Sequence, residues 1–273
     1  MAIDAKTRLY GVFGDPVTHS LSPALHNAAF GATGLNAVYL AFGLKGAKGA
    51  VDAVRHLNMG GASVTIPHKT DVMAHLDEVD ETARAIGAVN TIVNKAGKLI
   101  GFNSDVDGAM RALEQKGEIA GKKVVMIGAG GAARAIGYGI KQKGGSLLIA
   151  NRSADKGEAL AKDLGASFCP LTGLDLGDVD ILINATSVGM TPHVDDVPVP
   201  LDSLTSRTLV MDIVYNPLET ALLSAAKTAG CETVDGTAMF VFQAVAQFEL
   251  WTGLEAPVDL MRRTVLDALE RKS

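Results

Sequence analysis

The chain has 273 residues, of which 48% are hydrophobic and 20% are charged. This length predicts two domains, and the composition excludes the disordered and fibrous classes of protein. Because the formal net charge is −5 and Lys and Arg form no stripe along the sequence, we expect a small-molecule partner and no binding to nucleic acid or to a membrane.

Short apolar runs alternate with helical patterns in the first part of the chain. Strands are expected over residues 9–13, 38–42, 63–66, 90–93 and 99–102. Helices are expected over residues 22–30, 47–57 and 70–76. This βαβ order predicts a layered α/β domain with a largely parallel sheet over residues 1–106.

A second α/β series follows a helix that is expected over residues 107–116. Its expected strands are 123–127, 146–150, 181–184 and 209–212, and its expected helices are 132–143 and 155–164. Two long helices, 236–252 and 257–270, end the pattern. The predicted fold class is therefore α/β with two domains, each with a largely parallel sheet.

A glycine-rich segment joins the first strand of the second series to its helix. Gly128, Gly130 and Ala133 have the G-x-G-x-x-G/A spacing of a dinucleotide-binding turn. Gly128 permits the tight turn, Gly130 lets a pyrophosphate approach the backbone, and Ala133 lets the helix pack closely on the strand. Because a helix N-terminus attracts anions, the segment predicts a dinucleotide site; the alternative is a glycine-rich turn that only connects the two elements.

Asn151, Arg152 and Ser153 follow about 20 residues later, where an NAD-specific site carries an Asp or a Glu for the ribose 2′-hydroxyl. That acid is absent here. The guanidinium of Arg152 can instead offer two hydrogen bonds to a phosphate. The segment therefore favours NADP over NAD, and the alternative is a solvated arginine after a strand.

Hydroxyl groups and one cation stand at helix starts in the first domain. Ser20 and Ser22 lie around the start of the helix 22–30, and Ser22 is predicted to cap this helix. Both hydroxyl groups could also hold a substrate carboxylate at the helix N-terminus. Lys69, next to the helical pattern over residues 70–76, is expected in the first turn of a helix, where a cation opposes the helix dipole. Such a misfit often marks a site; the alternative is an exposed surface lysine.

Three more polar residues of the first domain, Thr65, Asn90 and Asp105, stand at or just beyond strand ends. In open α/β sheets, ligands bind at these ends. We therefore expect a polar site in the first domain in addition to the dinucleotide site in the second.

The cysteines and the N-terminal residues indicate a cytoplasmic protein. Cys169 and Cys231 form no Cys-x-x-Cys pair, which argues against a disulfide framework and a zinc site. The first residues lack the features of a signal peptide, and no apolar run approaches the length of a membrane span. The sequence leaves open whether the chain forms a homodimer.

Nine segments match the motifs of one known family in order and spacing. They include GDPVTHSLSPALHN, ASVTIPHK, GFNSDVDG, IGAGGAARAI and MFVFQAVAQFELWTG. On these motifs the chain resembles the shikimate dehydrogenases along nearly its whole length. The resemblance implies an N-terminal substrate-binding domain, an NADP-binding Rossmann domain over residues 107–237, and C-terminal helices, residues 238–273, that return to the first domain. The implied reaction is the reversible reduction of 3-dehydroshikimate to shikimate by NADPH, on the route to chorismate and the aromatic amino acids.

The resemblance also implies site residues, position by position. Lys69 and Asp105 match the family's catalytic pair. The implied substrate contacts are Ser20 and Ser22 for the carboxylate, and Lys69, Asp105, Thr65, Asn90, Gln243 and Tyr215 around the ring. The implied cofactor contacts are Gly128, Ala129, Gly130, Gly131, Ala132, Asn151, Arg152, Ser153, Thr186, Ser187, Ile213, Gly236 and Met239. The chain departs from the family at His68, Ser153 and Lys156, where Phe, Thr and Arg are frequent.

The residue types fit this chemistry. Hydride transfer to a ketone leaves negative charge on the oxygen, so a proton donor is needed there, and Lys69 is the candidate. Asp105 would favour the charged form of Lys69, whereas burial would oppose it. His19, His26 and His68 are alternative proton donors. No metal is expected, because hydride transfer to a nicotinamide requires none.

Two other functions stay open. A quinate or aminoshikimate dehydrogenase of the same family would use the same Lys and Asp pair. A non-catalytic NADPH-binding module would keep only the dinucleotide site, and the polar constellation of the first domain argues against it.

Overall fold

The computed structural model describes residues 3–271, and the chain divides into two units. Unit 1 contains residues 3–105 and 241–271, and unit 2 contains residues 106–240. The chain enters unit 2 at the start of helix α4 (Asp105–Glu114) and returns to unit 1 within helix α8 (Gly236–Thr252). The sequence predicts domain boundaries after residues 106 and 237. In the structure the boundaries follow residues 105 and 240.

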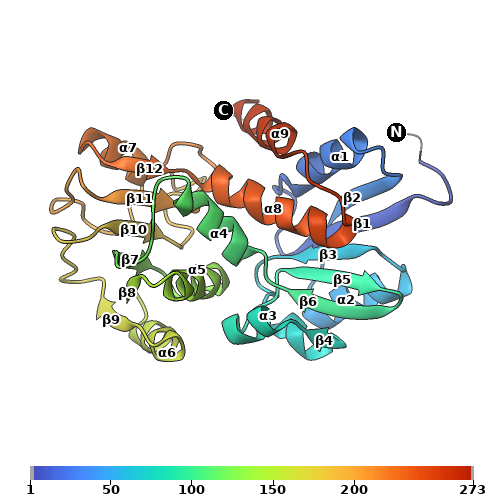
Figure 1. Cartoon of the computed structure of the whole chain (residues 1–273), viewed down its shortest axis with the longest axis horizontal. Coiled ribbons are helices and arrows are strands. Elements are labelled where there is room, and N and C mark those ends of the chain that lie inside the picture. Colours follow the sequence, from blue (N-terminus) through green and yellow to red (C-terminus); the bar gives the residue numbers. More distant parts are fainter. Residues whose placement is uncertain (1–2, 272–273) are drawn as a thin grey trace. The chain divides into compact units, whose positions relative to one another are not determined.

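Unit 1 is built on a six-stranded sheet with the order β2-β1-β3-β5-β6-β4 (Figure 1). Its strands are β1 (Arg8–Gly14), β2 (Ala37–Gly43), β3 (Gly61–Val64), β4 (Glu78–Val79), β5 (Thr91–Lys95) and β6 (Lys98–Phe102). β1 pairs in parallel with β2 and β3, and β4 pairs in parallel with β6. β5 runs antiparallel to both of its neighbours, so the sheet is mixed.

The direction of β5 is not predicted by the βαβ interpretation of the sequence. Only Ala96 and Gly97 join β5 to β6, and both have a positive φ, 52° and 92°. Positive φ at both positions is the geometry of the tightest hairpin turn, which glycine and asparagine favour. Alanine is uncommon there, so Lys-Ala-Gly-Lys gives only a weak hairpin signal.

The N-terminal part of unit 1 has more helices than expected. They are α1 (Ser22–Ala32), α2 (Ala47–His56), the 3₁₀ helix η1 (Asp71–His75) and α3 (Glu81–Ile86). The expected α-helix over residues 70–76 is wrong, because this segment forms only the five-residue η1. The unexpected α3 is fixed at both ends: the Asp80 carboxylate accepts from Thr82 N–H at 2.9 Å, and Gly87 ends the helix with φ 73°.

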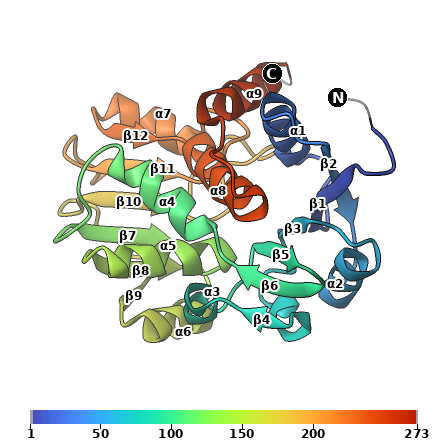
Figure 2. The same ribbon diagram turned by 45° about the vertical axis from the view of Figure 1, so that its right-hand side comes forward.

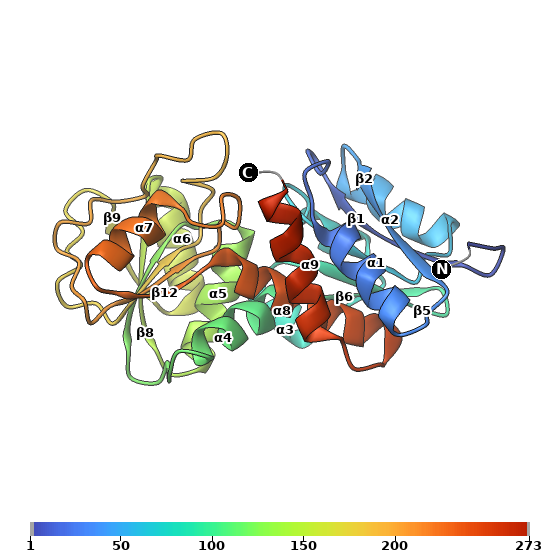
Figure 3. The ribbon, with the colours of Figure 1, turned by 90° about the horizontal axis from the view of Figure 1, so that it is seen from above.

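Both faces of the unit 1 sheet are covered by helices. On one side α2 buries Ala50, Val51 and Val54 in a core with residues from several strands. Helix α1 lies beside α9 (Val258–Glu270) in the views of Figures 1 and 3. Here an aromatic cluster forms between the sheet, α1 and α8, and Trp251 of α8 donates a hydrogen bond of 2.9 Å to the backbone oxygen of Ile92.

Unit 2 has a fully parallel six-stranded sheet with the order β12-β11-β10-β7-β8-β9. Its strands are β7 (Lys123–Ile127), β8 (Ser146–Asn151), β9 (Ser167–Pro170), β10 (Ile181–Asn184), β11 (Leu209–Asp212) and β12 (Glu232–Val234). Its other helices are α5 (Gly131–Gln142), α6 (Ala154–Leu164) and α7 (Ala221–Thr228), and Figure 2 shows α7 beside β12. The order reverses beside β7, where a doubly wound sheet binds its ligand.

The predicted fold class, α/β with two parallel-rich sheets, is confirmed. β9, β12 and α7 are additions that the sequence patterns do not predict. Strands β9 and β12 have four and three residues, and such short runs give little periodic signal. No helix within residues 3–271 is both long and apolar enough to span a membrane.

Candidate active site

Lys69 and Asp105 form an ion pair in unit 1. The Lys69 Nζ atom lies 2.5 Å from Asp105 Oδ2, and the two side chains are only 16% and 7% exposed. Lys69 lies between β3 and η1 and directly precedes Thr70, which is the N-cap of η1. The predicted position of Lys69 in the first turn of a helix is therefore wrong. Asp105 begins α4, where the helix dipole favours a negative charge. A largely buried ammonium beside a carboxylate can hold and transfer a proton.

Asn90 holds the other oxygen of this carboxylate. Its Nδ2 atom donates to Asp105 Oδ1 at 2.8 Å, and its Oδ1 atom accepts from Ser104 N–H at 2.8 Å. Asn103 Oδ1 accepts from the backbone N–H of Asp105 at 3.0 Å. The structure therefore brings together Lys69, Asn90 and Asp105, which are far apart in the sequence.

Ser20 and Ser22 lie at the start of α1, but their roles differ from the prediction. The N-cap is Leu21, and no side chain caps the helix, so the predicted cap by Ser22 is wrong. Instead, Ser20 Oγ accepts from Ser22 N–H at 3.2 Å. The Ser22 side chain is buried beside the Tyr39 hydroxyl. Burial raises the pKa of this hydroxyl, and its contacts with Ser63 and Ser22 oppose that rise.

The other predicted substrate residues lie in both units. Thr65 directly follows β3, and its backbone N–H donates to Phe13 at 2.9 Å. Gln243 lies on the unit 1 part of α8 and is 9% exposed. Tyr215 belongs to unit 2 and stacks on Phe240, with ring centroids 4.8 Å apart.

The three histidines named as alternative proton donors have different environments. His26 is fully buried, and burial lowers its pKa to about 3, although the Gln247 side chain acts in the opposite direction. It is therefore a neutral ring near pH 7. His68 is buried, and its Nε2 atom lies 2.7 Å from the backbone oxygen of Leu44. His19 is exposed.

The glycine-rich turn of unit 2 has the shape that the sequence predicts. Gly128 follows β7 with φ 117°, and a Cβ atom there would lie 2.9 Å from the backbone oxygen of Ala185. Gly130 is the N-cap of α5, and a Cβ atom there would meet nothing within 4 Å. The turn and first helical residues are Gly128, Ala129, Gly130, Gly131 and Ala132. No side chain caps α5, and no acidic residue lies in its first turn, so its N–H groups suit a phosphate.

Arg152 lies on the surface between β8 and α6. Asn151 Nδ2 donates to the backbone oxygen of Ser153 at 2.8 Å, which fixes the bend around the arginine. Ser153 is the N-cap residue of α6 but makes no side-chain cap bond. Among residues 3–271 no carboxylate forms an ion pair with Arg152. Its guanidinium is therefore available to a phosphate.

A buried carboxylate that the sequence analysis missed supports the loops after β10 and β11. Asp212 is fully buried and accepts from Asn184 Nδ2 at 2.9 Å and from the Thr220 hydroxyl at 2.7 Å. Burial raises the pKa of this carboxyl, and the three hydrogen bonds that it accepts oppose that rise. Asn184 in turn accepts from the Thr186 hydroxyl at 2.6 Å. A polar residue at the end of an otherwise apolar strand is the signal that could have identified both.

The remaining predicted cofactor residues lie around these loops or on α8. Ser187 is exposed beside Thr186, and Ile213 follows β11. Gly236 begins α8, and a Cβ atom there would lie 2.5 Å from the backbone oxygen of Ile213. Met239, one turn later, is buried.

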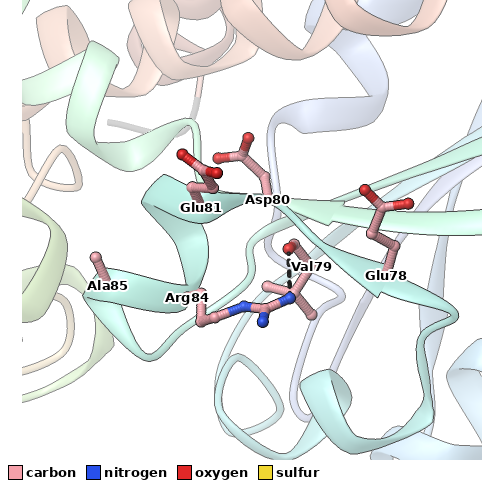
Figure 4. A pocket seen from close by; sticks show the side chains of 6 residues that line it. All are labelled: Glu78, Val79, Asp80, Glu81, Arg84 and Ala85. Carbon is pink, nitrogen blue, oxygen red and sulfur yellow. Dashed lines mark hydrogen bonds between the residues drawn. The ribbon is translucent and has the colours of Figure 1, made fainter.

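A separate hollow in unit 1, of about 770 Å³, contains none of the predicted site residues (Figure 4). It is lined by Glu78, Val79, Asp80, Glu81, Arg84 and Ala85. Asp80 is already used as the cap of α3, and Arg84 donates to the backbone oxygen of Val79 at 3.1 Å. Over the described part of the chain, no three His, Cys, Asp or Glu side chains are grouped to hold a metal ion.

Comparison with known proteins identifies the family. Residues 12–92 match the family profile of the shikimate dehydrogenase substrate binding domain, residues 110–215 that of shikimate / quinate 5-dehydrogenase, and residues 236–266 that of the shikimate 5'-dehydrogenase C-terminal domain. The NADP(+) shikimate dehydrogenase of Desulforamulus reducens is 46% identical over 96% of both chains. That of Methanocaldococcus jannaschii is 43% identical over 98% of this chain and all of its own.

The chain belongs to the shikimate dehydrogenase family. A crystal structure of a family member in complex with NADP+ has a TM-score of 0.95 at 43% identity and covers 98% of both chains. A quinate dehydrogenase from Corynebacterium glutamicum in complex with NAD has a TM-score of 0.90 at 35% identity and covers 96% of this chain and 99% of its own. The family predicted from the sequence motifs is confirmed.

Proposed function

We propose that this chain is an NADP-dependent shikimate dehydrogenase, which reversibly reduces 3-dehydroshikimate to shikimate. The observation that carries the proposal is the buried Lys69–Asp105 pair, with Asn90 on the second carboxylate oxygen, in a chain of this family. The names of the relatives bear out the enzyme class and the cofactor that the sequence predicts. The roles of individual residues are part of the proposal.

Lys69 is the proposed proton donor. When bound, NADPH supplies the hydride for the carbonyl carbon of the substrate. The ammonium of Lys69 gives a proton to the carbonyl oxygen, so that a ketone becomes an alcohol, and in the reverse direction Lys69 accepts it. Asp105 keeps Lys69 oriented through the hydrogen bond between their side chains. Asn90 holds Asp105 in place through its amide nitrogen.

Polar groups of unit 1 are assigned to the substrate. Ser20 and Ser22 at the N-terminus of α1 suit the substrate carboxylate, because hydroxyl groups and the helix dipole both favour an anion there. Ring contacts are assigned to Thr65, Asn90, Gln243 and Tyr215. Of these, Asn90 is the residue already hydrogen-bonded to the catalytic carboxylate.

The cofactor residues fit NADP. The uncapped N-terminus of α5 and the open space at Gly130 suit the pyrophosphate, and the unpaired guanidinium of Arg152 suits the 2′-phosphate. Thr186, Ser187, Ile213, Gly236 and Met239 are assigned to the nicotinamide half. Unit 2 is thus proposed as the cofactor domain and unit 1 as the substrate domain.

A quinate dehydrogenase is the second candidate, since the chain is 35% identical to one over most of its length and one family profile covers both activities. The absence of an acid at the ribose position, where Arg152 stands, argues for NADP and therefore for the first candidate.

A crossed initial-rate assay tests the proposal. The purified chain is given shikimate or quinate, each with NADP or NAD, and the reduced cofactor is followed by absorbance. We expect the highest kcat/KM for shikimate with NADP. Faster turnover of quinate with NAD would favour the second candidate, and cofactor binding without turnover of either acid would favour a non-catalytic module.

We also propose that the enzyme works in the cytoplasm. Its two cysteines, Cys169 and Cys231, are free, which suits a reducing compartment. A homodimer is the oligomeric state to test, by sedimentation of the full chain.

A further inference from the structure

A chain of buried hydrogen bonds in unit 1 leads from Tyr39 to the carboxylate of Asp105. The Tyr39 hydroxyl bonds to Ser63 Oγ at 2.7 Å, and Ser63 Oγ bonds to Gln247 Oε1 at 2.7 Å. The chain goes on from Gln247 Nε2 to Thr91 Oγ1 at 3.0 Å and from Thr91 Oγ1 to Asn90 Oδ1 at 2.7 Å. All five side chains are buried. Asn90 Nδ2 then donates to Asp105.

The direction of every bond is fixed by two backbone groups. Gln247 Nε2 lies 3.3 Å from the backbone oxygen of Asn90, which can only accept, so Oε1 must face Ser63. Ser63 must then donate to Gln247 and accept from Tyr39.

At the other end, the backbone N–H of Ser104 can only donate, so Asn90 Oδ1 must face it and Nδ2 must face Asp105. Thr91 accepts from Gln247 and donates to Asn90. Along the chain, the Ser63 and Thr91 hydroxyls therefore each donate once and accept once. A chain of this kind, with all donors pointing toward a carboxylate, strengthens cooperatively.

We propose that Gln247 is a positioning residue of the active site: it fixes the amide of Asn90 and thereby the carboxylate that orients Lys69. This inference rests on the proposed function. Gln247 lies on α8 and the residues that it aligns lie on β3, on β5 and just before β5, so the C-terminal helix supplies part of the support for the catalytic pair. Gln247 acts through Thr91 and Asn90 and is assigned no contact with the substrate.

The chain also has a consequence for Ser22. Tyr39 gives its proton to Ser63, so a hydrogen bond between Tyr39 and Ser22 must use the Ser22 proton. Ser20 accepts from a backbone N–H and keeps its own proton for a ligand. Ser20 is therefore the better donor to a substrate carboxylate.

Gln247→Glu tests the proposal through its pH dependence. When protonated, the introduced carboxyl group keeps one O–H donor and one accepting oxygen, whereas the ionised carboxylate can only accept and faces the backbone oxygen of Asn90. The groups that surround it are His26 on α1, Tyr39 on β2 and the Asp105–Lys69 pair. Burial and the charge of Asp105 favour the protonated form, so that form is populated at low pH.

We expect kcat of Gln247→Glu to stay within about threefold of wild type at pH 6. As pH rises, the ratio of wild-type to variant kcat should increase by up to about tenfold per pH unit, because one ionisation disables the variant. The Michaelis constant for NADP should not change. A ratio that is constant from pH 6 to 9 would overturn the proposal.

Trp251→Phe is the matched control. It removes another hydrogen bond between α8 and β5, one turn from Gln247, but leaves the chain from Tyr39 to Asp105 intact. Its kcat should follow wild type at every pH, with circular dichroism verifying the fold. If Trp251→Phe showed the same pH-dependent loss, the effect of Gln247→Glu would be a general loosening of α8, and the proposal would fall.

Tyr39→Phe is a second, uncharged variant for the case that Gln247→Glu does not fold. It frees Ser63 to rotate, and we expect kcat to fall threefold or more with an unchanged Michaelis constant for NADP. Wild-type values would overturn the proposal. A wild-type protein that does not oxidise shikimate would contradict the proposed function instead, so the two failures are distinct.

Discussion

At the scale of single residues, Arg152 is proposed to set the cofactor preference. Its guanidinium is exposed and has no ion-pair partner among the described residues, so it is free to bind a 2′-phosphate. Arg152→Ala should raise the Michaelis constant for NADP about tenfold or more and that for NAD much less, because only NADP carries the phosphate. Steady-state kinetics with both cofactors measure this.

Arg207→Ala is the control for this change, because Arg207 is also an exposed arginine of unit 2 but stands outside the proposed cofactor residues. It should leave both Michaelis constants unchanged. Equal losses for NADP and NAD in Arg152→Ala would contradict the assignment of the 2′-phosphate site.

His26 makes the stability of the fold depend on pH. Its pKa is about 3 in the folded chain, because of burial, against 6.5 for an exposed histidine. Below pH 6.5 the unfolded chain binds a proton that the folded chain does not, so this contribution to stability is present above pH 6.5 and is lost as the pH falls toward 3.

His26→Phe should therefore flatten the dependence of the unfolding free energy on pH between about 6 and 4. The difference in slope should approach about 1.4 kcal/mol per pH unit, the value for one proton. Urea unfolding at several pH values measures the slopes, and the offset caused by the new ring does not affect them. Parallel curves for the two proteins would mean that His26 is charged in the folded state.

At the scale of elements, the N-terminus of α1 is proposed to bind the substrate carboxylate. Replacing Ser20 and Ser22 together with Ala should weaken shikimate binding by roughly 1 to 3 kcal/mol, because the Ser20 donor to the carboxylate is lost together with the neighbouring Ser22 hydroxyl. NADP affinity should stay the same. Calorimetric titration of the folded variant measures both, and unchanged shikimate affinity would leave the serines a purely structural role.

The contact of α8 with the sheet is tight at Gly61. A Cβ atom at Gly61 would lie 2.3 Å from Trp251 Nε1 and 2.6 Å from the backbone oxygen of Ile92, the two groups that are hydrogen-bonded to each other. Gly61→Ala should lower the free energy of unfolding by about 1 to 3 kcal/mol.

Gly49→Ala is the matched change, since Gly49 lies within α2 and a Cβ atom there would meet nothing within 4 Å. It should stabilise the protein by about 0.5 to 1 kcal/mol, because alanine favours the helix. Equal effects of both changes in urea unfolding would show that the contact at Gly61 does not limit the packing of α8.

The sequence predicts an element well when its residues form a clear apolar pattern. The strand of the glycine-rich turn, β7, is predicted residue for residue, because a buried parallel strand is a continuous apolar run. The hairpin at Ala96 and Gly97 is missed because alanine rarely adopts a positive φ, and η1 is taken for an α-helix because both share a helical pattern over so few residues.

At the scale of the whole molecule, the residue types of the candidate site could be predicted but its support could not. Lys69, Asn90 and Asp105 carry functional groups near strand ends, which the sequence reveals. Gln247 is 156 residues from Thr91, and only the fold brings the two side chains into hydrogen-bond distance. Asp212 is missed for a similar reason, since its partners Asn184 and Thr220 lie on other segments.

Lys69 and Asp105 are proposed to act as one catalytic unit. We expect Lys69→Ala to lower kcat roughly 100- to 10,000-fold with a modest change in the Michaelis constant for shikimate, which is the range of general acid-base catalysis. Asp105→Asn should also lower kcat and should raise the Michaelis constant, because Asp105 is assigned a substrate contact as well. The ion pair joins the two residues, so their effects should not add.

The most direct test is kcat for shikimate oxidation with NADP in Lys69→Ala, Asp105→Asn and the double variant, with folding verified by circular dichroism. We expect the double variant to be little slower than the slower single variant. A Lys69→Ala enzyme within threefold of wild-type kcat would contradict the catalytic role of Lys69 and would return the role of proton donor to His19 or His68.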